Sequence, residues 1–72
     1  MQVKIIWHSD NTSETIDIEQ AAAMVIPPGV HGLTAADVAS RWRSIIERLP
    51  SDRAAVFGVH PTRGRFEVRA AE

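Results

Sequence analysis

The sequence predicts an α+β fold: a two-layer sandwich with a four-stranded, mainly antiparallel sheet, one main amphipathic helix and a short helical segment. Four short segments alternate between apolar and polar residues, as half-buried strands do. Residues 35–49 instead repeat their apolar side chains at helical spacing. A chain of 72 residues has room for one hydrophobic core, so we expect a single domain over residues 1–72.

The first two strands are expected to form a β-hairpin. Residues 2–8 form the first strand, and the second ends near Asp17 or Ile18. The polar run 9–13 between them has short side chains that bond their own backbone, as turns require. The first strand is expected to place Val3, Ile5 and Trp7 against the helix and Lys4, Ile6 and His8 on the opposite face.

Two helical segments follow the hairpin. Residues 18–25 are rich in strong helix formers, and Asp17 and Gln20 have the spacing of a capping box. The main helix, residues 35–49, follows Thr34, which is a favourable N-cap residue. Its apolar stripe is expected to face the sheet and consists of Val38, Trp42, Ile45, Ile46 and Leu49.

The third and fourth strands are predicted at residues 54–60 and 65–70, joined by a loop that contains Gly64. The first and third strands are apolar on both faces, whereas the second and fourth alternate with charge. This contrast predicts that the first and third strands are central, in the sheet order 2-1-3-4. The third strand is expected to bury Ala55, Phe57 and Val59 and to turn Val56, Gly58 and His60 away from the helix.

The composition is typical of a globular domain. Hydrophobic residues make up 44% of the chain and charged residues 24%, with a net charge of −1. The uncharged run at residues 5–8 is too short for a signal-peptide core or a membrane span. We therefore expect a soluble, cytoplasmic protein.

Side chains that support catalysis or metal binding are few and dispersed. The chain has no cysteine, and the spacing of His8, His31 and His60 matches no metal-binding motif. No serine lies in a nucleophile elbow, and no glycine-rich loop has the spacing that cradles phosphate. The sequence therefore predicts no catalytic residues, no metal site and no cofactor.

The leading interpretation is a small non-catalytic protein-interaction module, either a homodimer or a protein that docks on a larger assembly. Compact domains of this kind occur among accessory and phage-encoded inhibitor proteins, which is an analogy only. The docking surface is expected on the uncovered sheet face, where an apolar centre between acidic and basic edges would be self-complementary about a two-fold axis. The residues assigned to it are Ile6, Val56, Asp17, Glu19, Arg65 and Arg69.

The alternative interpretation is a nucleic-acid-binding protein. Most of the basic residues are arginines, whose planar guanidinium groups pair well with phosphates. The negative net charge and the continuous main helix, which lacks the turn of a helix-turn-helix, weigh against this alternative. The residues assigned to it, on the helix and the last hairpin, are Arg41, Arg43, Arg63 and Arg65.

Overall fold

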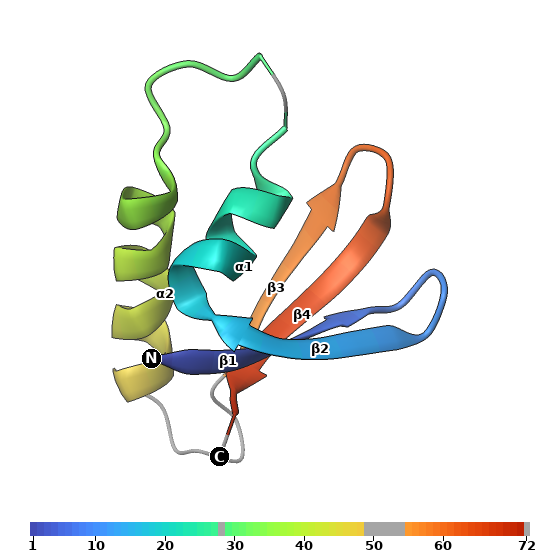
Figure 1. The fold of residues 1–72 in the computed structure, drawn as a ribbon, viewed down its shortest axis with the longest axis horizontal. Helices are drawn as coiled ribbons and strands as arrows, with labels where there is room; N and C mark the ends of the chain where they lie inside the picture. Colours follow the sequence, from blue (N-terminus) through green and yellow to red (C-terminus); the bar gives the residue numbers. More distant parts are fainter. Residues whose placement is uncertain (28, 49–54, 72) are drawn as a thin grey trace.

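The computed structural model describes residues 1–27, 29–48 and 55–71, and within them the chain forms four strands and two helices (Figure 1). Both helices lie on one face of an antiparallel sheet, which confirms the predicted α+β class. The predicted residues 49 and 54, at the ends of the main helix and the third strand, lie outside the described ranges. The elements are β1 (Gln2–Trp7), β2 (Thr12–Asp17), α1 (Ile18–Val25), α2 (Ala35–Arg48), β3 (Ala55–His60) and β4 (Gly64–Ala70).

The strand order is β2-β1-β4-β3, with every neighbouring pair antiparallel, so the predicted order 2-1-3-4 is wrong. The error lay in taking the charged alternation of β4 as the sign of an edge strand. Alternation shows only that one face of a strand is uncovered, and in a two-layer sandwich that is also true of central strands. β4 is therefore central, and the more apolar β3 lies at the edge.

The predicted faces of β3 are reversed in the structure. Directly opposed residues of an antiparallel pair share a face, and Val56 opposes Val68 of the buried core. Val56 therefore faces the helices, whereas Phe57 and Val59 are 69% and 71% exposed. Because successive side chains alternate between faces, one wrong assignment inverts the whole strand.

The core lies between the sheet and the two helices. Trp7 and Trp42 are both buried there, as predicted. The apolar stripe of α2 is shifted from its predicted position, because Ile45 is exposed and Ala39 is buried. Ala39 lies on the side of α2 that faces α1, where a small side chain allows the two helices to approach closely. Leu49, the last residue of the predicted stripe, lies outside the described residues.

Both helices begin where their capping residues predict. The Asp17 carboxylate accepts a hydrogen bond from the backbone N–H of Glu19, and the Gln20 side chain accepts one from the backbone N–H of Asp17, which completes a capping box. The Thr34 hydroxyl accepts a hydrogen bond from the backbone N–H of Asp37 at 3.1 Å. These bonds satisfy backbone donors that the first helical turn leaves unpaired.

Candidate protein-interaction surface

The sheet face turned away from the helices, which we call the far face, has an apolar patch at its β3 end. Phe57 and Val59 have the most exposed large apolar side chains in the described part of the chain. Ala55 is on the same face, because side chains two residues apart in a strand point the same way. We call Ala55, Phe57 and Val59 the β3 patch.

A hollow of about 520 Å³ lies beside Phe57 and Val59, lined by residues of β3 and β4 and by His8, which follows β1. Phe57 and Val59 supply apolar side chains to it, while Arg65 of β4 and His8, directly after β1, supply polar groups. An apolar centre beside polar groups is the usual anatomy of a protein-binding surface.

The hydrogen bonds of β4 establish which backbone groups face which neighbour. The backbone N–H of His8 donates to the Arg65 carbonyl at 3.0 Å, and that of Ala71 donates to the Gln2 carbonyl at 3.2 Å. In an antiparallel ladder, the residues that bond one neighbour alternate with those that bond the other. The odd-numbered residues of β4 therefore bond β1, and the even-numbered residues bond β3.

The same alternation fixes the orientation of the β3 backbone. Val56 opposes Val68, an even-numbered residue of β4, so the even-numbered residues of β3 bond inward. The N–H and C=O groups of Ala55, Phe57 and Val59 therefore point away from β4. No described strand pairs with that side of β3, which we call the free edge. Phe57 and Val59 thus combine exposed side chains with outward backbone groups, and Ala55 adds outward backbone groups beside a half-buried side chain.

The two edges of the sheet differ in their protection against strand pairing. The other edge strand, β2, carries Glu14 and Asp17 among hydroxyl residues. β3 has the sequence AVFGVH, with no proline and no acidic or strongly basic side chain. Its register with β4 runs without a bulge from Ala55 to His60. Charges, proline and bulges are the devices by which proteins prevent edge pairing, and β3 has none of them.

The charged side chains beside the patch are engaged with one another. Glu67 is only 8% exposed although it lies on the far face, and it forms an ion pair with Arg69. The His8 Nε2 atom lies 3.4 Å from the other Glu67 oxygen, so His8 adds a second ion pair when it is protonated. Arg69 therefore stabilises a nearly buried carboxylate within the domain.

The residues predicted to bind a partner do not form one surface. Ile6, Arg65 and Arg69 are on the far face as expected, but both arginines belong to a central strand instead of a basic edge. Val56 was predicted for the far face, and it faces the core instead.

Both predicted acidic contacts belong to the start of α1. Asp17 caps α1, and Glu19 lies in the first turn of that helix, so the acidic edge is not arranged as predicted. The predicted gradient from acid through apolar to base is absent from the described far face because it required the wrong strand order. Phe57 and Val59 do lie there, and their predicted position in the core is wrong.

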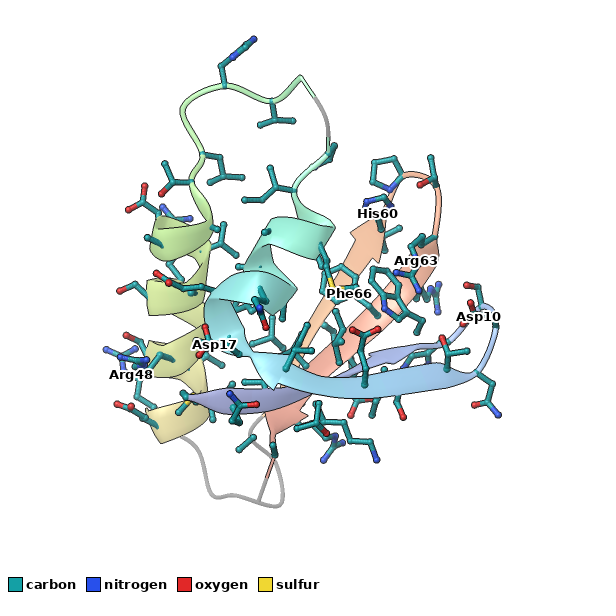
Figure 2. All side chains as sticks on the ribbon, in the orientation of Figure 1. Asp10, Asp17, Arg48, His60, Arg63 and Phe66 are labelled. Carbon is teal, nitrogen blue, oxygen red and sulfur yellow. The ribbon has the colours of Figure 1, made fainter. Side chains whose placement is uncertain are left out.

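The arginines predicted to bind nucleic acid are dispersed. Arg41 and Arg43 are two residues apart in α2, which places them about 200° apart around the helix. Arg43 lines a hollow beside Asp17 and Glu19. In Figure 2, α2, on which Arg48 is labelled, lies on the opposite side of the molecule from the hairpin tips near Asp10 and Arg63.

Arg63, at the tip of the last hairpin, is occupied by an aromatic contact. Figure 2 shows Arg63 beside the tip of the first hairpin, which is marked by Asp10. The guanidinium carbon of Arg63 lies 3.8 Å from the centre of the Trp7 ring, a cation–π arrangement. The nearby Asp10 carboxylate accepts a hydrogen bond from the Thr12 hydroxyl, which lowers the pKa of Asp10 below its ordinary value, and the charge of Arg63 adds to this effect. Arg63 thus lies near an anionic group on the tip of the first hairpin, between β1 and β2.

The histidines are separated, and His60 has a structural role. Its Nδ1 atom accepts hydrogen bonds from the backbone N–H groups of Thr62 and Arg63, each at 3.2 Å. Its ring meets the edge of Trp7 with a centroid distance of 5.9 Å. Within residues 1–27, 29–48 and 55–71, no group of three or more His, Asp or Glu side chains is arranged to hold a metal ion.

Comparisons with protein families, with curated proteins and with solved structures find no match to this chain. Neither described helix is long and apolar enough to cross a membrane. The class of protein must therefore be inferred from the surface itself, where the main feature of the described residues is an apolar edge strand that carries no charge, proline or bulge.

Proposed function

We propose that this protein is a non-catalytic protein-interaction module that binds a β-strand of its partner along the free edge of β3. The observation that carries the proposal is the coincidence of two features in the β3 patch. The outward backbone groups of Ala55, Phe57 and Val59 offer hydrogen bonds, and the apolar side chains of Phe57 and Val59 are exposed beside them. In strand addition, main-chain bonds give affinity and alternate side chains give specificity.

Burial of the β3 patch against a partner is favoured over its exposure to water. Full burial of Phe57 or Val59 stabilises a complex by about 1.5–3 kcal/mol each. An exposed, uncharged edge strand is also a site of uncontrolled pairing in any protein that leaves it uncovered. A partner strand seated on β3 removes this hazard and uses the apolar area for binding.

Proline at position 59 tests the proposal without disturbing the domain. The Val59 N–H points to the free edge, so proline removes no hydrogen bond to β4, and proline is tolerated at such positions of edge strands. It does remove a donor that an incoming strand needs. We therefore expect Val59→Pro to fold like the parent, as judged by its melting temperature and circular dichroism, while strand addition is lost.

The experiment uses a photo-crosslinking phenylalanine analogue placed at position 57 in the cell of origin. The matched control carries it at position 45, because Ile45 is an exposed apolar residue on α2. We expect a protein adduct of defined mass from position 57, none from position 45, and loss of the adduct in the Val59→Pro background. No adduct at position 57, or an adduct that persists with Val59→Pro, overturns the proposal.

A further inference from the structure

We infer that the strand bound by β3 is β3 of a second copy of this chain, paired antiparallel about a two-fold axis at Phe57. The inference rests on the proposed function, since it names the partner of the same edge. Two identical strands related by a two-fold axis perpendicular to the sheet run antiparallel, and each presents the same groups to the other. Pairing of the two β3 strands would form one continuous sheet across both copies, with all helices on the same face of that sheet.

The orientation of the backbone selects the register. With the axis at Phe57, this residue faces its own copy, and Ala55 faces Val59 of the second copy. The backbone N–H and C=O groups of all three residues point away from β4, so each of these groups gains a hydrogen-bond partner in the second copy. With the axis at Gly58, Ala55 instead faces Pro61, which has no N–H to donate.

The charges near the axis permit two identical surfaces to meet. β3 has no acidic or strongly basic side chain, and the nearest charged residues on the far face belong to β4. Across the pairing, the β4 strands of the two copies are three strand spacings apart, or about 14 Å. This exceeds the Debye length of about 8 Å at physiological ionic strength, so repulsion between like charges is largely screened.

The available area indicates a weak, reversible dimer. The chain exposes 4815 Å², and a standard interface of about 800 Å² per partner would cover about a sixth of this surface. Pairing through a six-residue strand with two large apolar side chains lies at the low end of this class. We therefore expect dissociation in the micromolar range, detectable as a concentration-dependent mass.

Single cysteines test the partner and the register together, because the natural chain has no cysteine. Residues that face each other in a hydrogen-bonded pair have Cα atoms about 5.5 Å apart, which a disulfide can span. Phe57→Cys should therefore form a covalent dimer under mild oxidation. Val59→Cys is the matched control, because its two copies would lie about 14 Å apart along the strands.

Sedimentation velocity over a concentration series completes the test. We expect the parent and Ile45→Lys to dimerise equally, and Phe57→Lys and Val59→Pro to remain monomeric with unchanged melting curves. A parent that stays monomeric, or a disulfide that forms with Val59→Cys but not with Phe57→Cys, overturns the inference. If the photo-crosslinked adduct at position 57 has the mass of another protein, self-pairing fails while the proposed function stands. If there is no adduct, both fail.

Discussion

Replacing Gly58 by alanine tests the packing that fixes the orientation of β3. A Cβ atom at this position would lie 2.4 Å from Cζ and 2.8 Å from Cε2 of Phe66, both far inside van der Waals contact. The Phe66 ring cannot move away easily, because it is buried against Trp7 and Trp42 with centroid distances of 5.5 and 6.3 Å. Rotation of the ring about its own axis leaves Cζ in place, so the conflict must be relieved by the core or the strand.

The expected cost is the difference between two opposing effects. Forcing an extra methyl group into a well-packed core costs about 1–3 kcal/mol. Alanine also restricts the unfolded chain relative to glycine, which recovers about 0.4–1 kcal/mol. The net loss for Gly58→Ala is therefore about 1–2 kcal/mol, which lowers the melting temperature of a domain of this size by about 5–15 °C.

Thermal unfolding at low protein concentration measures this loss without a contribution from self-association. Phe66→Leu provides the control, because leucine removes the ring atoms that a Cβ at Gly58 would meet. In the Phe66→Leu background we expect Gly58→Ala to be nearly neutral, with a coupling of about 0.5–3 kcal/mol between the two changes. If Gly58→Ala is as stable as the parent, or if the two effects simply add, Phe66 does not pack against Gly58.

Three further predictions follow from the packing, the capping and the arginines. Trp42→Ala should cost about 3–5 kcal/mol in thermal unfolding, and a loss below 1 kcal/mol would show that this side chain is not in the core. Asp17→Ala should cost about 1 kcal/mol by removing the cap of α1, whereas Asp17→Asn should retain most of that stability, so equal losses would contradict the capping role. Generic duplex and single-stranded oligonucleotides should show no binding by fluorescence anisotropy at low salt, because Arg63 is engaged with Trp7. Salt-sensitive binding that is lost in Arg63→Ala/Arg65→Ala would instead support the nucleic-acid alternative.

Features that depend on a few neighbouring residues were predictable from the sequence. The capping box at Asp17 and Gln20 and the N-cap at Thr34 are bonds over two or three residues, so their spacing alone was sufficient. The burial of Trp42 followed from the helical period of its segment. The position of α1 beside α2 buries Ala39 and leaves Ile45 exposed. The helical period of the α2 segment alone could not predict this position.

The strand order and the candidate site required information that the sequence does not display locally. Residues 55–60 are apolar on both faces, so alternation could not show which set is buried. The short helix and the long helix both lie on one face, so one apolar set of β3 had to be left outside. The presence of apolar residues on both faces of β3 could have indicated that either Phe57 and Val59 or Val56 would be exposed. Choosing between the two sets required knowing that no described helix covers the far face.

The fit of Gly58 against Phe66 connects the core to the proposed interface. The aromatic side chains of Trp7, Trp42 and Phe66 fill the space above β4, so the opposing residue of β3 has room for no side chain. If β3 turned its other face inward, the neighbouring large side chain of Phe57 or Val59 would have to enter this space. The core therefore fixes both residues on the far face, where their apolar character adds little to the packing of a single copy. Polar residues at positions 57 and 59 would suit an isolated domain as well, so a phenylalanine and a valine there support the proposal that a partner covers β3.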